Sequence, residues 1–221
     1  TSVTPKVVGR YVYYNNSSFD GNSAAATTAD FAAVATDKQA LLPGQMASFA
    51  NYTSYSNGIN GIMIDMAGLP AGGSLSVADF SFRTGLGGNP TGWALAPAPA
   101  GIVIFRGVGA GGSDRVALTW ADGAIAGKWL QIKVLATANT KLATADVFYF
   151  GNAPGATGTT TTNPMVTSDD SQAVLPEESG DHVAVANAFD FNRDGVVNSI
   201  DFNIAQSSET TAATALQIIT T

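Results

Sequence analysis

The feature that most constrains this chain is a twelve-residue stretch, residues 190–201, which reads D-F-N-R-D-G-V-V-N-S-I-D. Oxygen-bearing side chains stand at positions 1, 3, 5, 9 and 12 of the stretch, and glycine stands at position 6. This spacing is typical of a calcium loop, in which about six to eight oxygens surround the ion and the glycine permits a sharp turn. The expected ligands are five side chains and one backbone carbonyl: Asp190, Asn192, Asp194, Val196 (through its carbonyl), Asn198 and Asp201. The alternative is a polar turn whose side chains only satisfy nearby backbone groups, and the completeness of the spacing favours calcium.

The residues around the end of this loop resemble a known calcium-binding family. The loop ends at Asp201, where an EF-hand usually carries the longer Glu, and no clear helix pattern precedes it. After the loop, residues 197–205 read V-N-S-I-D-F-N-I-A. This combination resembles the type I dockerin, whose loop is followed by a helix of the form V-N-S-x-D-x-x-x-A. The resemblance implies a small calcium-binding α domain, over residues 165–214, that docks on a protein partner.

Dockerins are similar to one another in carrying this unit twice, and a degenerate first copy lies upstream. Residues 165–170 read M-V-T-S-D-D and parallel V-V-N-S-I-D at 196–201, which places Thr167 and Asp170 at the ninth and twelfth loop positions. The segment in front of them lacks the D-x-N-x-D-G pattern, so a second calcium there would depend on carbonyls and on Asn152. A solvated Thr/Gly linker over residues 154–164 is equally consistent with the sequence.

The negative charge of the chain is concentrated in its last quarter. From Asp169 onward there are nine acidic residues and one basic residue, Arg193, so this tail has a net charge of −8. The rest of the chain has a net charge of +1, which gives the total of −7. The carboxylates of the tail repel one another until an ion offsets the repulsion, which should couple calcium binding to folding. The chain lacks the basic stripe that a nucleic-acid partner needs, and no apolar run reaches the roughly 18 residues of a transmembrane segment.

Residues 1–153 show the pattern of a β domain. Short runs with alternating apolar residues are separated by Gly, Asn and Pro turns, with no long helix pattern between them. The expected strands are residues 7–14, 59–66, 78–83, 101–106, 115–120, 129–135 and 146–150. This predicts a mainly β chain, an antiparallel β-sandwich of jelly-roll or cohesin-like type, followed by the calcium-binding α segment. Residues 215–221 are predicted to form a final strand that returns to the sandwich or adds to a neighbour, and residues 28–42 a short helix or ordered loop.

The body also resembles a sandwich domain found near the C-termini of secreted planctomycete proteins, where it precedes a dockerin-like pair. The phrases that carry this resemblance are Y-N-N-S-S-F-D-G at 14–21, G-I-N-G-I-M at 58–63 and D-V-F-Y-F-G-N-A at 146–153. The resemblance covers nearly the whole chain and carries no assigned chemistry. It implies an accessory module that is secreted or held at the cell surface.

Composition argues against catalysis. Residues 1–168 contain no Cys, His or Glu, and the one histidine, His182, lies beside Asp181 without a nucleophile signature. The eight aspartates of the body leave an Asp-dependent glycosidase formally open. Asp65 lies inside an apolar strand, where a structural ion pair with a buried arginine such as Arg10 or Arg83 is expected.

The sequence therefore predicts a non-enzymatic extracellular structural or interaction protein. Its calcium-ordered tail would dock on a β-sandwich, either its own or that of a neighbouring copy, and so mediate protein–protein association. Head-to-tail contacts of that kind build rings, filaments or tubes. The alternative is a carbohydrate-binding module with a dockerin in a secreted polysaccharide-degrading system. For that function the tyrosines and tryptophans would stack on sugars, and the stretch N-Y-T-S-Y-S at 51–56 is expected to be exposed, although a sandwich core also buries aromatics.

Overall fold

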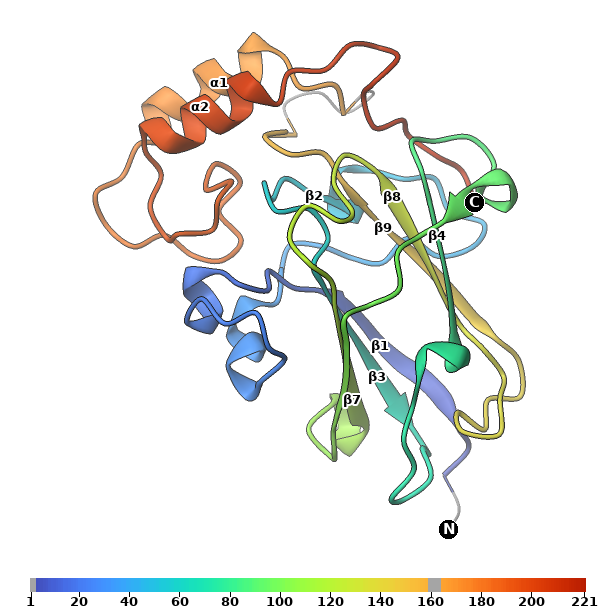
Figure 1. Cartoon of the computed structure of the whole chain (residues 1–221). Helices are drawn as coiled ribbons and strands as arrows, with labels where there is room; N and C mark the ends of the chain where they lie inside the picture. Colours follow the sequence, from blue (N-terminus) through green and yellow to red (C-terminus); the bar gives the residue numbers. More distant parts are fainter. Residues whose placement is uncertain (1–2, 159–163) are drawn as a thin grey trace.

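The computed structural model describes residues 3–158 and 164–221, and it contains two β-sheets with a pair of helices at one end (Figure 1). The first sheet has the strand order β1-β3-β7-β6: β1 (Lys6–Val12), β3 (Gly61–Ala67), β7 (Asp114–Thr119) and β6 (Gly101–Phe105). The second has the order β2-β9-β8-β4-β5: β2 (Tyr52–Thr53), β9 (Asp146–Asn152), β8 (Trp129–Val134), β4 (Phe80–Gly85) and β5 (Ala94–Leu95). The prediction of a β-rich chain with few helices is confirmed.

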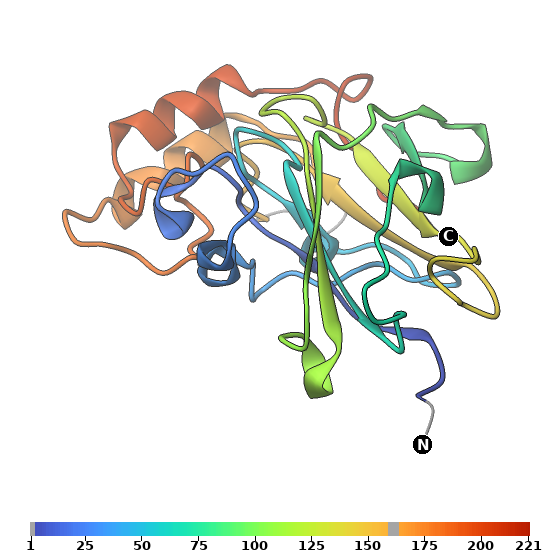
Figure 2. The ribbon, with the colours of Figure 1, turned by 60° about the horizontal axis from the view of Figure 1, so that its bottom comes forward.

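The helical elements are short. The two α-helices, α1 (Ser168–Val174) and α2 (Ser199–Ser207), lie side by side at one end of the molecule (Figure 2). The 3-10 turns are η1 (Ser18–Asp20), η2 (Thr28–Ala33), η3 (Phe49–Asn51), η4 (Val77–Asp79), η5 (Pro90–Gly92), η6 (Ala110–Gly112) and η7 (Leu175–Glu177). The segment predicted as a short helix or ordered loop over residues 28–42 is thus the turn η2 followed by a loop.

One strand pair departs from the expected antiparallel arrangement. β2 runs parallel to β9, with Tyr52 opposite Gly151 and Thr53 opposite Asn152. The pair is only two residues long, and the Asn152 amide reinforces it by donating to the Thr53 hydroxyl at 3.1 Å. The prediction of a purely antiparallel body is therefore wrong at this edge, because so short a strand leaves no alternating pattern in the sequence.

The two sheets share one hydrophobic core. Its fully buried residues alternate along the strands of both sheets: Ile62, Ile64, Val116 and Leu118 from the first, and Leu130, Ile132, Phe148 and Phe150 from the second. The Phe82 and Trp120 rings meet edge to face across this core, with centroids 5.4 Å apart. On β8 the intervening residues Gln131 and Lys133 remain half-buried on the outer face, as the two-residue period of a strand requires.

A second, smaller core joins the end of the chain to the outer face of the second sheet. Leu216 and Ile219 are buried against Trp129 and its neighbours, and the Trp129 indole donates to the Gln217 carbonyl at 2.8 Å. Residues 215–221 thus return to the chain's own body. They form an isolated bridge between Met46 and Thr220 and no strand of a sheet, so the predicted final strand is wrong in its secondary structure.

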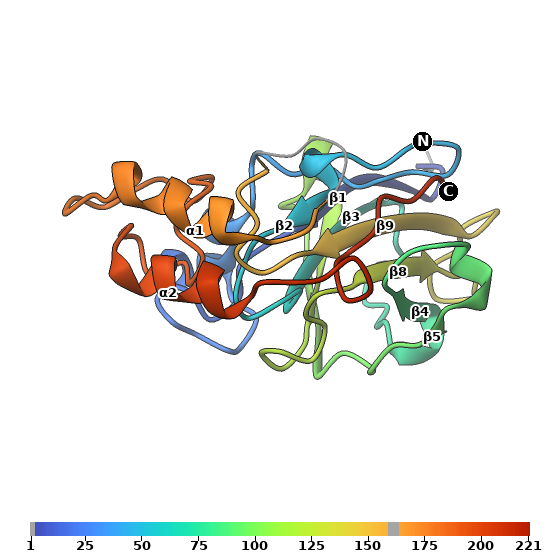
Figure 3. The ribbon, with the colours of Figure 1, turned by 90° about the horizontal axis from the view of Figure 1, so that it is seen from above.

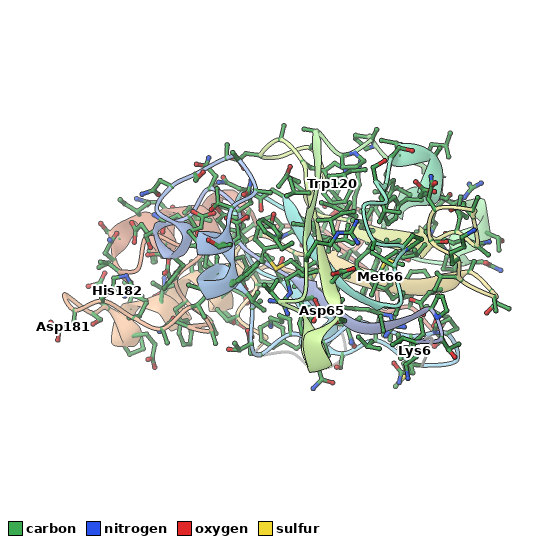
Figure 4. All side chains as sticks on the ribbon, turned by 90° about the horizontal axis from the view of Figure 1, so that it is seen from below. Lys6, Asp65, Met66, Trp120, Asp181 and His182 are labelled. Atoms are coloured by element: carbon green, nitrogen blue, oxygen red, sulfur yellow. The ribbon has the colours of Figure 1, made fainter. Side chains whose placement is uncertain are left out.

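The buried Asp65 is paired across strands. Asp65, labelled in Figure 4, lies opposite Arg115 in the β3–β7 register. Arg115 Nε donates to Asp65 Oδ1 at 2.7 Å, and Arg115 Nη2 donates to Asp65 Oδ2 at 2.9 Å. The expected partners were wrong, because Arg10 binds Asp146 and Arg83 donates to the Trp93 carbonyl. Burial disfavours the ionised form of Asp65, but the hydrogen bonds from Arg115 and the Ala110 amide outweigh it and hold the pKa below its usual range.

Replacing Asp65 with Asn should destabilise the body by about 3 kcal/mol, because Arg115 would lose its charged partner in a buried site. Urea unfolding followed by tryptophan fluorescence measures the change. Arg106→Gln, at a more exposed ion pair, is the matched control and should cost less than about 1 kcal/mol. Because the folded pKa of Asp65 is depressed, its contribution is present above about pH 4 and is lost as the pH falls through the folded pKa. Equal losses in the two variants would contradict this assignment.

Deleting residues 215–221 should lower the free energy of unfolding by about 3 kcal/mol or more, because Leu216 and Ile219 would leave a cavity beside Trp129. Thermal unfolding and a red shift of tryptophan emission would report the loss. Met46→Ala is the control, since that side chain is 72% exposed and contributes little burial. A deletion variant as stable as the intact chain would refute the role of this segment.

Candidate metal centre

The predicted calcium loop leads directly into α2, and Asp201 ties its two ends together. Asn198 caps the helix, with its side-chain oxygen accepting from the Ile200 amide at 2.7 Å. Asp201 Oδ2 accepts from the Asn198 amide at 3.0 Å, and Asp201 Oδ1 accepts from the Phe191 amide at 2.7 Å. The same carboxylate thus closes a capping box and holds the start of the loop against the start of the helix.

Asp190, the first residue of the loop, is fully buried. Its Oδ2 accepts from the Gly195 amide at 3.0 Å, whereas its Oδ1 has no hydrogen-bond partner. Burial raises the pKa of Asp190 to about 6; Arg193 and the Gly195 amide oppose the shift, and the carboxylates of Asp201 and Asp194 add to it. A buried, unpartnered carboxylate oxygen is costly unless a cation compensates it.

The turn at the loop centre depends on its glycine. Gly195 has φ of 89°, and a Cβ atom on it would lie 2.5 Å from Nε2 of His182. Arg193 also has a positive φ, of 56°. His182 is itself an exposed loop residue whose ring meets Phe19 edge to face, at 5.3 Å between centroids. Glycine is therefore required at position 6 both for its positive φ and because a side chain there would clash with His182.

The other predicted ligands bond to one another. Asn192 donates to Asp194 Oδ2 at 2.8 Å, and Asp194 Oδ1 accepts from the amide of Val196 at 2.9 Å. Within residues 3–158 and 164–221, no group of three or more Asp, Glu, His or Cys side chains converges as a metal cluster. The donor set nevertheless fits a hard cation, because it consists of carboxylate, amide and carbonyl oxygens and includes the unpartnered oxygen of Asp190. To serve as ligands, Asn192 and Asp194 would exchange their mutual hydrogen bond for contacts to the ion.

The first copy repeats the capping geometry of the second. Thr167 caps α1, and Asp170 Oδ2 accepts from the Thr167 amide at 2.9 Å. Asp170 Oδ1 accepts from the Thr157 amide at 2.9 Å, as Asp201 Oδ1 accepts from Phe191. The two helices pack against each other, as the view from above makes plain (Figure 3). The tail is thus a pair of similar units, each tied together by an aspartate at the third helical position.

The structure uses Asn152 differently from the expectation of a second calcium ligand. This residue is fully buried at the end of β9, where its oxygen accepts from the Gly127 amide at 2.9 Å. Its nitrogen donates to Thr53 and to the Tyr55 carbonyl, at 2.9 Å for the latter. The Asn152 side-chain amide therefore bonds within the body, and none of its hydrogen bonds is to Thr167 or Asp170. Residues 159–163 of the predicted linker lie outside the described residues.

A residue that the calcium pattern does not include joins the loop to the body. Arg193, at position 4, is only 2% exposed, and its guanidinium carbon lies 4.2 Å from the centroid of the Tyr14 ring. It donates to the Tyr14 hydroxyl at 3.1 Å and to Ser54 Oγ at 3.3 Å, and it also donates to the Asn187 carbonyl. One signal in the sequence points to it, because Arg193 is the single basic residue among the nine acids of the tail.

Backbone contacts continue this junction on both sides of Arg193. The Ser18 amide donates to the Arg193 carbonyl at 2.9 Å, and the Ser56 amide donates to the Phe191 carbonyl at 2.8 Å. The predicted calcium loop therefore lies on the chain's own body, in contact with η1 and the segment after β2.

The aspartates of the body have structural partners. Asp20, Asp30 and Asp79 accept backbone amides at the starts of 3-10 turns. The remaining acids bind arginine, lysine or asparagine side chains: Asp37 with Lys38, Asp65 with Arg115, Asp114 with Arg106, Asp146 with Arg10, and Asp122 with Asn16 and Asn60. None of these contacts resembles a pair of carboxylates facing one cleft.

All three tryptophans and five of the six tyrosines, which were considered for sugar stacking, are buried, and Tyr11 is half-buried. Tyr52 and Tyr55, expected to be exposed, are inside the protein, so that expectation is wrong. Trp93, Trp120 and Trp129 are also buried, and each indole nitrogen donates to a backbone carbonyl. Long apolar side chains of both sheets cover these rings, which accounts for their position in the two cores.

Comparisons with protein-family models, with curated proteins and with solved structures find no match for this chain. No helix among the described residues is long and apolar enough to cross a membrane.

Replacing Arg193 with Ala should lower the stability of the tail by about 2 kcal/mol, because the buried Tyr14 hydroxyl would lose its hydrogen-bond partner. Hydrogen exchange should show faster exchange of the loop amides and of the Ser18 amide. Arg193→Gly separates the two effects, since glycine accepts the positive φ without strain and still lacks the side chain. Asn203→Ala, on the exposed side of α2, is the control and should leave exchange unchanged. Unaltered exchange in both Arg193 variants would disprove the junction.

Proposed function

We propose that this chain is a non-enzymatic extracellular interaction protein whose calcium-ordered tail supports association with other proteins, foremost with further copies of itself. The two sheets would form a sandwich of the jelly-roll or cohesin-like type, and the tail would be a dockerin-like pair. The observation that carries the proposal is the buried Asp190, whose unpartnered oxygen stands at the first ligand position of a complete twelve-residue loop. Calcium would supply a positive charge at that point and offset the repulsion among the loop carboxylates.

The contacts of Arg193 with the body support a role for the loop in protein association as well as in metal binding. Arg193 lies between Asp190 and Asp194 in the chain, and its side chain contacts the body. The same short segment therefore determines both the conformation of the loop and its position on the body. An ion that orders the loop should therefore also stabilise the position of the whole tail relative to the body. The surface that the tail presents to a partner would then exist only when calcium is bound.

Calcium should bind with a dissociation constant of about 10⁻⁴–10⁻³ M, as is typical of extracellular modules, and isothermal titration calorimetry measures it. Asp190→Asn and Asp201→Asn should each weaken binding by about tenfold or more, because each removes a ligand charge at nearly constant shape. Asp169→Asn is the control, since Asp169 is an exposed acid of α1 and is not a predicted ligand. Unchanged affinity in both loop variants would refute the calcium site.

Chelation should convert associated species to smaller ones. Sedimentation velocity in calcium and then in chelator tests this, with magnesium as the control ion, because magnesium demands a tighter octahedral shell and binds such loops less well. A protein whose size is the same in calcium and chelator would contradict the proposed role of the tail in association.

The body should hydrolyse no polysaccharide, since residues 1–168 contain no His, Cys or Glu and the aspartates of the body bind structural partners. A panel of neutral and acidic polysaccharides with a reducing-sugar assay provides the measurement. Turnover that a single Asp→Asn change in the body abolishes would overturn the non-enzymatic assignment.

A further inference from the structure

A groove crosses the outer face of the second sheet, on the side away from the shared core. Two adjoining hollows of about 460 and 430 Å³ form it, and Thr91, Gln131 and Tyr149 line both. Arg83 of β4 and Lys133 of β8 line the larger hollow. Arg83, Gln131 and Lys133 occupy the outward positions of strands whose inward positions fill the core, so polar and cationic side chains reach the floor of the groove.

The groove is a cationic recess in an acidic protein. No acidic side chain lines either hollow. Lys133 is half-buried and makes no ion pair or hydrogen bond within the described residues, and Arg83 donates only to the Trp93 carbonyl, at 2.7 Å. Gln131 donates to the Tyr149 hydroxyl at 3.0 Å and so orders the floor between the two cations. Two partly desolvated positive charges without a counter-charge favour an anionic ligand.

The tail carries a segment with complementary chemistry. Glu177, Glu178 and Asp181 are exposed on η7 and the loop that follows it. None of the three carboxylates makes a hydrogen bond or ion pair within the described residues, although the Asp181 backbone contacts Ser179. Leu175, 47% exposed at the start of the same turn, adds an apolar side chain that a groove could bury. We call residues 175–181 the acidic loop.

The acidic loop and the groove lie at opposite ends of the molecule. In the view from above, the helical tail extends from one end, while β4, β5 and β8 lie toward the other (Figure 3). Asp181 is at the outermost tip of the tail in the view from below (Figure 4). The loop therefore cannot enter the groove of its own chain. A contact between them would join two copies through different surfaces, which is a head-to-tail contact that can repeat.

We propose that the groove of one copy receives the acidic loop of a second copy, with Lys133 and Arg83 facing Glu177 and Glu178. This inference rests on the proposed self-association and names the two surfaces that would carry it. Opposite charges that meet in a partly desolvated groove set the orientation of the two copies and raise the rate of their encounter. Salt should weaken the contact, because the acidic loop is exposed to solvent.

Sedimentation velocity of the full chain in saturating calcium tests the proposal with two charge-reversal variants, Lys133→Glu and Glu177→Lys/Glu178→Lys. Each variant alone should associate about tenfold or more weakly than the unaltered chain, because every contact would place like charges together. An equimolar mixture should regain association at the original affinity as heterodimers. In the mixture, the intact groove of the second variant can receive the intact loop of the first, which a symmetric contact between identical surfaces would not allow.

Matched controls separate these surfaces from net charge. Lys128→Glu changes an exposed lysine just before β8, outside the groove, and Glu209→Lys changes an exposed acid of the tail outside the acidic loop. Both should associate like the unaltered chain, and thermal unfolding should be unchanged in all four variants. Association that falls equally in the controls would show a general charge effect and overturn the proposal.

The outcomes also distinguish this inference from the proposed function. If chelator disperses the unaltered chain while both reversal variants still associate, the groove and loop are the wrong surfaces and the calcium-dependent role stands. A chain that is monomeric in calcium at every concentration overturns both. If Lys133→Glu abolishes binding of polygalacturonate and leaves self-association intact, the groove is a site for an acidic polysaccharide and the proposal is overturned.

Discussion

The position of the tail depends on the contacts that the buried guanidinium of Arg193 makes with the body. Arg193 stands at position 4 of the predicted calcium loop, and its side chain reaches into the body between Tyr14 and Ser54 and stacks on the Tyr14 ring. Among the described residues, Arg193 has no acidic partner at ion-pair distance, and the hydrogen bonds of its two Nη atoms and the Tyr14 ring replace part of the water it has lost, although its Nε has no hydrogen-bond partner. The loop that would bind the ion and the residue that seats the tail are therefore one structural unit.

At several places in the chain, an aspartate side chain accepts backbone hydrogen bonds at the start of a turn or helix. Asp79 in the body and both Asp170 and Asp201 in the tail accept the backbone amide three residues before them, at the start of a turn or helix. Asp170 and Asp201 also accept an amide from a distant part of the chain. In a protein without disulfides, these buried carboxylates hold loops in place by accepting several amide hydrogen bonds at once. The cost is electrostatic repulsion where several of them meet, as in the loop around Asp190.

The return of the chain end to the body has a consequence for the surface. Residues 216–219 cover Trp129 and thereby bury aromatic area that a sugar-binding face would have exposed. The same segment forms one wall of the groove over the second sheet, because Ile218 and Ile219 line the smaller hollow. The charged side chains that line the open part of this face are the cations Arg83 and Lys133, so the surface favours an anionic partner over a stacking one.

Local patterns in the sequence determined much of this protein, and long-range packing decided the rest. Alternation placed Leu130 and Ile132 inward, and residues 190–201 form a turn that leads into a helix, as the local pattern predicts. The partner of Asp65 could not be derived, because strand register depends on which strands become neighbours and not on the residues next to it in sequence. The burial of Tyr52 and Tyr55, the commitment of Asn152 to the body and the insertion of Arg193 were likewise decided by tertiary structure. Each of these side chains contacts residues remote in the chain, and a local pattern carries no information about such contacts.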